Sequence, residues 1–314
     1  MKILKTPLQR FDNLPGYSFQ ANYCDVGPIL VHDQNEQAHH FNTLNMHYVD
    51  YGDKHAPVVL MLHGEPSWSY LYREMINDAE AAGFRVIAPD LIGFGKSDKF
   101  NQQSAYTYAN HLLWLTEFIK RLGLCNIHLI CQDWGGLLGL RVLAAQPEWF
   151  ASLIVSNTML PTGERSPSKA FIDWQEYSQQ SSSFDIGNIL QGATCKDLID
   201  EVIAAYNAPF PDETYKAGAR KFPLLVPTST SDPESTNNKN AWATLSKLSL
   251  PVLTLFSDCD PITKGGDKIF QKLMPGCKGQ AHTTLKNGGH FLQEDCAHNF
   301  MRHALKFIKG LSNG

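Results

Sequence analysis

Short runs of unbroken apolar residues alternate with amphipathic stretches along most of this chain. Such runs are typical of strands buried on both faces of a parallel sheet, and the amphipathic spacing is typical of helices that pack against it. The runs predict strands at residues 57–62, 85–90, 126–132, 152–156 and 251–256. Alternation of apolar and polar residues predicts another strand at 44–51, and a last strand is expected at about 281–285. The pattern predicts helices at residues 106–122, 137–145, 264–272 and 291–308, and one that ends near Gly83. This alternation indicates right-handed βαβ units and a mostly parallel sheet.

The pattern changes between Asn157 and Thr230, where strand signals disappear and short helical stretches lie between prolines. We interpret this segment as a helical cap that is inserted into the α/β core. The polar segment 229–240 then leads the chain back to the core. We therefore predict a core of residues 1–157 and 231–314, and a cap of residues 158–230.

The sequence around Asp133 predicts a sharp turn between a strand and a helix. The apolar run 126–132 ends directly before Asp133-Trp134-Gly135-Gly136. A reactive side chain on such a turn, with small residues around it, is the nucleophile elbow of the α/β-hydrolase fold. The usual motif is G-x-S-x-G, whereas here an aspartate replaces the serine and Cys131 replaces the first glycine. An aspartate at this place can also be a plain N-cap of the helix.

Two later residues favour a catalytic interpretation of Asp133. Asp260 follows the predicted strand 251–256, and His290 follows the last predicted strand. A nucleophile, an acid and a histidine in this chain order form the triad of the α/β-hydrolases. Side chains that follow parallel strands also gather at one edge of the sheet. Asp258 is the main rival of Asp260 for the position of the acid.

Composition narrows the expected partners. The 314-residue chain is 43% hydrophobic and has a formal net charge of −4 without a basic run, so neither nucleic acid nor an anionic membrane is expected. Seven cysteines at wide spacing, without a C-x-x-C motif, indicate reduced thiols and a cytoplasmic location. We expect neither a signal peptide nor a transmembrane helix. No histidine or cysteine pattern has the spacing of metal ligands, so no metal and no cofactor are expected.

Four motifs together resemble the haloalkane dehalogenases, and the resemblance covers nearly the whole chain. They are His63-Gly64-Glu65-Pro66, Gln132-Asp133-Trp134-Gly135-Gly136, Asp260-Pro261 and Gly289-His290-Phe291. Phe171-Ile172-Asp173-Trp174, at the start of the insertion, resembles the subfamily whose second halide-binding tryptophan lies in the cap. The H-G-x-P motif alone has little weight, since epoxide hydrolases share it. D-W-G-G together with a cap tryptophan is far more specific.

The resemblance implies hydrolysis of short-chain haloalkanes to an alcohol and a halide, through a covalent alkyl ester on Asp133. His290 would activate the water that cleaves this ester, and Asp260 would orient His290. The indole N–H groups of Trp134 and Trp174 would bind the halide. The residue types suit these roles, because a carboxylate is already anionic and an indole N–H can only donate.

The resemblance also implies an oxyanion hole and a substrate pocket. The backbone N–H groups of Glu65 and Trp134 would form the hole. The apolar pocket would be lined by Phe171, Phe222, Pro223 and Val226. The side chain of Glu65 cannot bind a halide when it is ionised, since a carboxylate repels an anion. Asn157 occupies a loop in which some relatives place the acid; an amide supplies no charge, which leaves Asp260.

Two other functions stay open at this point. An epoxide hydrolase would use the same Asp–His–Asp set, with acidic phenols in the cap, for which Tyr177, Tyr206 and Tyr215 are candidates. A binding protein on a hydrolase fold would often lack one member of the triad. The expected partners are a small apolar halogenated substrate, water and the halide product, and we expect a monomer.

Overall fold

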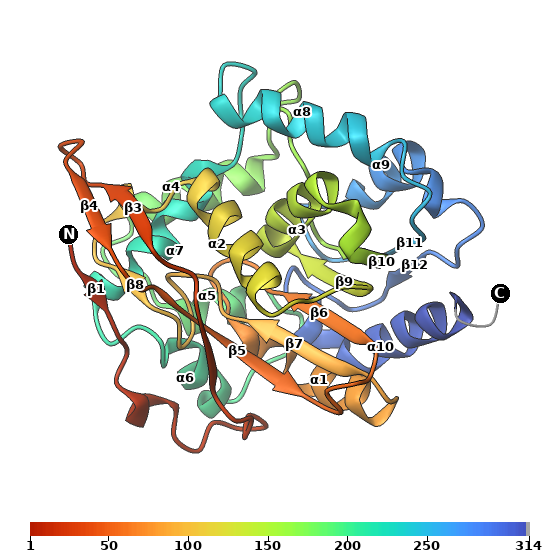
Figure 1. The fold of residues 1–314 in the computed structure, drawn as a ribbon, viewed down its shortest axis with the longest axis horizontal. Coiled ribbons are helices and arrows are strands. Elements are labelled where there is room, and N and C mark those ends of the chain that lie inside the picture. Colours follow the sequence, from red (N-terminus) through yellow and green to blue (C-terminus); the bar gives the residue numbers. More distant parts are fainter. Residues whose placement is uncertain (312–314) are drawn as a thin grey trace.

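A twisted eight-stranded sheet forms the centre of the computed structural model, which describes residues 1–311 (Figure 1). The strand order is β12-β11-β10-β9-β6-β7-β5-β2. The five pairs from β12 to β7 are parallel, and β5 and β2 are antiparallel to their neighbours. The strands are β2 (Asn22–Asp25), β5 (Asn45–Tyr51), β6 (Val58–Leu62), β7 (Arg85–Pro89), β9 (Ile127–Gln132), β10 (Phe150–Ser156), β11 (Val252–Ser257) and β12 (Thr283–Leu285).

Helices cover both faces of this sheet. Two of them, α1 (Arg73–Ala81) and α10 (Leu292–Leu311), pack together on one face. The opposite face carries α2 (Tyr108–Arg121), α3 (Asp133–Ala145), α8 (Pro233–Leu245) and α9 (Gly266–Leu273), as Figure 1 shows. The parallel strands are buried almost throughout because both faces are covered, which explains their unbroken apolar runs. The predicted α/β-hydrolase architecture is therefore confirmed.

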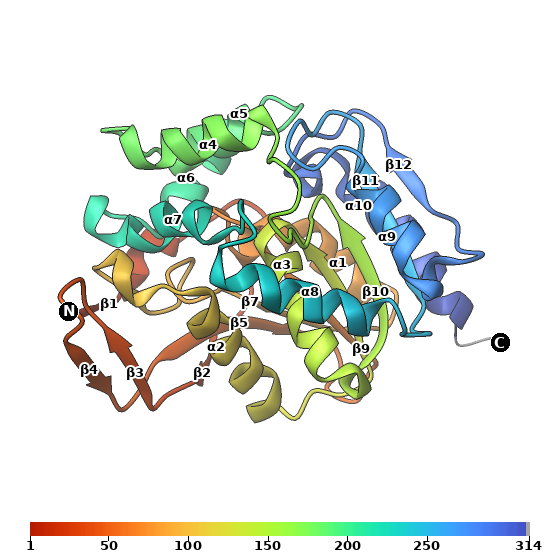
Figure 2. The ribbon, with the colours of Figure 1, turned by 90° about the horizontal axis from the view of Figure 1, so that it is seen from above.

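The segment between β10 and β11 holds a layer of helices above the sheet edge at which the parallel strands end (Figure 2). These helices are α4 (Lys169–Gln180), α5 (Ile186–Gly192), α6 (Asp200–Asn207) and α7 (Ala217–Lys221). The N-terminal segment supports this layer from the side, since Arg10 Nε donates to the Ala208 carbonyl at 2.7 Å. The cap boundaries at residues 157 and 230 stay a prediction.

The seven predicted strands are present, but some elements differ from the prediction. Two small antiparallel pairs lie apart from the central sheet: β3 (Ile29–His32) with β4 (Ala38–Phe41), and β1 (Ile3–Leu4) with β8 (Lys99–Phe100). Helix α3 begins at Asp133 itself, so the two glycines after the elbow are already helical. Among residues 1–311 no helix is long and apolar enough to cross a membrane.

Helix α8 corrects the interpretation of residues 229–240 as a polar connection. Its N-cap is Asp232, whose side chain accepts from the Glu234 N–H at 2.9 Å, and Pro233 occupies the first turn. Its buried face mixes serine and asparagine with alanine and leucine, so the apolar periodicity is weak. Helix α8 is held on α3 partly by hydrogen bonds instead of apolar contacts. Arg141 on α3 donates to Glu234 and Asn238 at 2.8 and 2.9 Å.

Candidate active site

Asp133 lies at the junction of β9 and α3 with φ at +49°, a left-handed conformation that is uncommon for any residue except glycine. Neighbouring chain segments hold it there. Its N–H donates to the Asn157 carbonyl at 3.0 Å, and its carbonyl accepts from Thr158 Oγ1 at 2.7 Å. Gly135 lets the elbow approach β6, because a Cβ at that position would lie 2.0 Å from the Leu62 carbonyl oxygen. Strain of this kind persists where the surroundings fix the chain, which is typical of functional sites.

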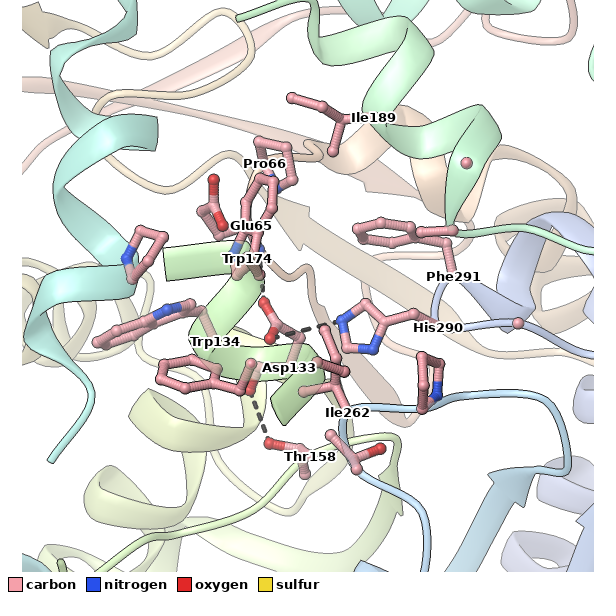
Figure 3. Close-up of a pocket in the computed structure, with 18 of the residues that line it drawn as sticks. Glu65, Pro66, Asp133, Trp134, Thr158, Trp174, Ile189, Ile262, His290 and Phe291 are labelled. Carbon is pink, nitrogen blue, oxygen red and sulfur yellow. Dashed lines mark hydrogen bonds and ion pairs between the residues drawn. The ribbon is translucent and has the colours of Figure 1, made fainter. Parts of the chain in front are cut away.

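The carboxylate of Asp133 points into the pocket and meets groups from two other loops (Figure 3). The backbone N–H of Glu65 donates to Asp133 Oδ1 at 2.7 Å. The other oxygen, Oδ2, lies 3.6 Å from His290 Nε2. Gly64 is required beside it, since a Cβ there would lie 2.5 Å from the Asp133 Cβ. The structure thus brings the predicted oxyanion-hole donor of Glu65 onto the carboxylate that it would serve.

Asp260 and His290 form a hydrogen-bonded pair behind Asp133. His290 Nδ1 lies 3.1 Å from Asp260 Oδ2, and the Ile262 N–H donates to Asp260 Oδ1 at 2.8 Å. Burial acts to raise the pKa of Asp260, but the charge of His290 and its hydrogen bond lower that pKa to about 2. Burial acts to lower the pKa of His290, and the charge of Asp260 and hydrogen bonds to both aspartates raise it to about 10. The neighbouring aspartates therefore favour the protonated form of the His290 imidazole in the resting site.

Asp258, the rival acid, lies elsewhere. Its carboxylate accepts from Cys259 Sγ at 3.3 Å and lies 3.5 Å from Lys286 Nζ. The described structure therefore places Asp260, and not Asp258, beside His290. Asn157 has a different part: its Nδ2 donates to the carbonyls of Gly289 and His290, at 3.0 Å each. It fixes the loop that carries the histidine.

Sequence reasoning missed two side chains that hold the triad. Gln132 Nε2 donates to the His290 carbonyl at 3.2 Å and lies 3.1 Å from His290 Nε2. Thr263 Oγ1 donates to Asp260 Oδ2. Gln132 directly precedes Asp133 in the motif Gln132-Asp133-Trp134-Gly135-Gly136, so its position beside the nucleophile could have indicated this role. Thr263 has no sequence signal, because a threonine after a proline turn is common on any surface.

The two tryptophans face the pocket from opposite walls. Trp134 belongs to the first turn of α3 and is 2% exposed, and Trp174 is a half-buried residue of α4 in the cap. Both line the same pocket as Asp133, and in Figure 3 both indoles lie beside its carboxylate, on the side away from His290. Trp174 stacks on Phe184, with ring centroids 5.7 Å apart, which orients the indole. Trp134 and Trp174, which are far apart in the sequence and were both predicted to bind the halide, thus line the same pocket.

The pocket encloses about 590 Å³ between cap and core and has mainly apolar walls. Phe171, Pro223 and Val226 line it, as predicted. The prediction for Phe222 is wrong: this side chain is fully buried and is absent from the lining. Its ring packs edge-on against the Trp134 indole at 4.5 Å between centroids, so it supports the pocket wall from behind.

The side chain of Glu65 is 5% exposed and lines the pocket. Burial, followed by the charge of Asp133, raises its pKa well above the usual value. This shift favours the neutral form of the Glu65 carboxyl, which would not repel a halide as an ionised carboxylate does. Within residues 1–311, its Oε1 has no hydrogen-bond partner.

The phenols required by an epoxide hydrolase do not converge on the pocket. Only Tyr177 of the three candidates is part of the lining. Tyr206 is fully buried and donates to Glu294, and burial raises its pKa well above the usual value. Among the described residues, no group of three or more histidine, cysteine or acidic side chains is arranged to hold a metal ion.

An elbow, a carboxylate nucleophile position and an Asp–His pair at the ends of successive strands define an α/β-hydrolase, and residues 57–296 match the model of the alpha/beta hydrolase fold family. The chain is 52% identical over 308 residues to a haloalkane dehalogenase from Psychrobacter cryohalolentis, with 98% of each chain covered. It is 43% identical over 295 residues to one from Mycolicibacterium paratuberculosis, with 94% of each covered. The chain belongs to the haloalkane dehalogenase family, whose members are hydrolases that act on carbon–halide bonds.

Solved structures agree with this assignment. The haloalkane dehalogenase DpaA from Paraglaciecola agarilytica, described as tetrameric, superposes with a TM-score of 0.86 at 33% identity over 98% of both chains. A putative ancestral haloalkane dehalogenase superposes with a TM-score of 0.73 at 26% identity over 86% of this chain and 97% of the other. These relatives do not favour the epoxide hydrolase alternative.

Proposed function

We propose that this protein hydrolyses short-chain haloalkanes in two steps, with Asp133 as the nucleophile. The observation that carries the proposal is the position of the Asp133 carboxylate, which shares one pocket with Trp134 and Trp174 and lies 3.6 Å from His290. An aspartate that serves only as a helix cap needs neither a histidine–aspartate pair nor indole donors beside it.

In the first step, Asp133 attacks the carbon that bears the halogen. A carbon–oxygen bond forms, the carbon–halogen bond breaks, and the halide leaves with the bonding electrons. A leaving anion in an apolar pocket needs hydrogen-bond donors, because its desolvation would otherwise oppose the reaction. The indole N–H groups of Trp134 and Trp174 supply them. The mainly apolar walls hold the alkyl group.

In the second step, His290 removes a proton from a water that attacks the ester carbonyl of Asp133. Esterification makes this possible, because it removes the negative charge of Asp133, which helps to raise the pKa of His290 to about 10. Once that charge is gone, the imidazole loses its proton more readily and can act as a base. Asp260 then stabilises the imidazolium that forms.

The tetrahedral intermediate of the second step carries an oxyanion on the former carboxylate. The Glu65 N–H, 2.7 Å from Asp133 Oδ1, is placed to donate to it. The Trp134 N–H at the first turn of α3 is the proposed second donor, and the helix N-terminus favours negative charge there. Removing one such donor typically costs about 3 kcal/mol of transition-state stabilisation.

Halide release from 1,2-dibromoethane and 1-bromobutane, followed by ion chromatography, tests the proposal. Asp133→Ala is expected to abolish release. His290→Gln is expected to release one halide per protein and to keep the alkyl group as an ester, visible by intact-mass spectrometry. A His290→Gln protein that turns over repeatedly, or a native protein that releases no halide from a broad panel, would refute the mechanism.

We propose that the protein is a monomer in the cytoplasm, as composition and cysteine usage predict. The tetrameric description of a relative at 33% identity gives the competing expectation for assembly. Light scattering coupled to size exclusion, over a range of protein concentrations, distinguishes a particle of 35.1 kDa from one four times heavier.

A further inference from the structure

Two cysteines from different layers of the molecule meet at the edge of the pocket. Cys195 lies in the cap between α5 and α6, and Cys259 lies in the core loop after β11, directly before Asp260. Both line the pocket and both are exposed. The two thiols are neighbours at this edge, so that each influences the ionisation of the other. The catalytic mechanism uses neither of them.

Backbone contacts show why these two loops are adjacent. The Cys259 N–H donates to the Gly288 carbonyl at 3.0 Å. The next residue, Gly289, donates to Asp295 Oδ2 at 2.7 Å, and the same carboxylate accepts from the Cys195 N–H at 2.9 Å. The backbone N–H groups of both cysteines therefore donate hydrogen bonds to the same short stretch of chain, from Gly288 to Asp295. The cap loop also lies directly on this segment, since a Cβ at Gly289 would lie 2.4 Å from the Ala193 carbonyl oxygen.

We propose that Cys195 and Cys259 form a reversible disulfide that cross-links cap and core at the rim of the pocket. The oxidant is a low-molecular-weight disulfide. The Cys195 thiolate attacks one of its sulfurs and releases one small thiol. Cys259 then loses its proton and attacks the Cys195 sulfur, and the second small thiol leaves with that proton. Two protein thiols are oxidised by two electrons in total, and the small disulfide is reduced to two thiols.

The surroundings of Cys259 decide the order of these steps. Its Sγ donates to Asp258 Oδ1 at 3.3 Å. That hydrogen bond, followed by the neighbouring Cys195 thiol, raises the pKa of Cys259 to about 11. Cys259 therefore stays protonated at neutral pH and is a poor first nucleophile. Cys296, a third nearby cysteine, is already engaged, since its Sγ donates to the Lys286 carbonyl at 3.5 Å.

The cross-link acts on turnover in two ways. It ties the cap loop after α5 to the core, and movement of a lid often limits substrate entry or product release. It also pulls on Cys259, the neighbour of Asp260, whose Oδ2 must stay 3.1 Å from His290 Nδ1. Both effects lower kcat, so the oxidised protein is expected to lose activity and to regain it with a reductant.

The test starts from the fully reduced protein, which is incubated with oxidised glutathione and then alkylated. Intact mass and peptide mapping are expected to show the loss of two hydrogen atoms and a peptide linked through Cys195 and Cys259. The same product is expected from Cys125→Ser, which changes an exposed cysteine at the far end of β9. Cys195→Ser and Cys259→Ser are expected to gain glutathione without forming the bridge.

Three results would overturn the proposal. One is a native protein that carries glutathione adducts and no bridge. Another is a bridge that maps to Cys296. The third is a bridged protein with the same kcat as its own reduced form, which would refute the effect on turnover. The mass measurement does not depend on dehalogenase activity, so failure here is distinguishable from failure of the proposed reaction.

Discussion

The two walls of the pocket are built in opposite ways. On the core wall, Asp133 has a strained backbone that contacts from Asn157, Thr158 and Glu65 hold in place. On the cap wall, Trp174 belongs to α4, a helix with only one fully buried residue. The reacting carboxylate is thus fixed by several neighbours, whereas the cap tryptophan lies on a lightly packed helix. Precision is needed for the first, and adaptability is useful for the second.

The largest expected effect is on the core wall. Asp260→Asn keeps the size of the side chain but removes the charge that stabilises the His290 imidazolium. We expect kcat to fall about 10⁴-fold, as is typical when a triad aspartate becomes an amide. Steady-state halide release measures the loss.

Asp258→Asn is the matched control, because this rival acid is two residues away and faces Lys286 instead. Its turnover is expected to stay close to that of the native protein. Equal losses in the two variants would show that the loop, and not the contact between Asp260 and His290, carries the effect.

The next effect concerns the cap wall. Trp174→Phe keeps an aromatic ring but removes the indole N–H, so one halide donor is lost. We expect kcat/KM to fall about 10²–10³-fold, the usual loss for one donor aimed at developing charge. Single-turnover halide release isolates this first step.

Tyr177→Phe gives the comparison for Trp174, since Tyr177 stacks beside it at 6.0 Å between ring centroids and also lines the pocket. This variant loses a polar group from the same helix without touching the indole. If both variants lose the same amount, the packing of α4 rather than the Trp174 N–H determines the rate.

A smaller effect is the coupling between the two ends of the triad. Asp133→Asn removes a charge and a hydrogen bond that raise the pKa of His290. We expect that pKa to fall from about 10, and NMR titration of the imidazole measures it. Because the pKa of His290 is raised on folding, its protonation stabilises the folded state fully below the unfolded pKa of about 6.5, and this contribution is lost as pH rises through about 10.

The matched variant for this titration is Asp258→Asn, which leaves the pKa of His290 unchanged if proximity is the cause. A native pKa of His290 that survives in Asp133→Asn would refute the charge coupling, and with it the proposed activation of the base by esterification. Intact mass confirms the substitution after each titration.

The core wall was predictable from the sequence, and much of the cap wall was not. Asp133 and Asp260 each follow a strand with a clear apolar run, His290 follows the short last strand, and the chain order of the three is informative by itself. Phe222 was placed wrongly because an aromatic residue in a cap looks the same whether it faces the substrate or supports Trp134. Helix α8 was missed because polar partners on α3 replace its apolar stripe. The adjacency of Cys195 and Cys259 depends on three loops, and no local pattern reports it.

The smallest expected effect tests where the two walls meet. Glu65 contributes its backbone N–H to Asp133, and its buried side chain, whose pKa is raised, lines the pocket. Glu65→Gln keeps the backbone donor and carries no charge. We therefore expect kcat/KM to change by less than about tenfold, which corresponds to about 1.4 kcal/mol. Bromide affinity, measured by quenching of indole fluorescence, is also expected to stay close to the native value. A strong gain in bromide affinity would show that Glu65 is ionised in the native site and repels the halide.

Glu65→Ala separates the role of the side chain from that of the backbone N–H, since it also keeps the N–H but leaves an empty volume beside Asp133. A loss confined to that variant would assign the side chain to filling space, and the backbone N–H to the reaction.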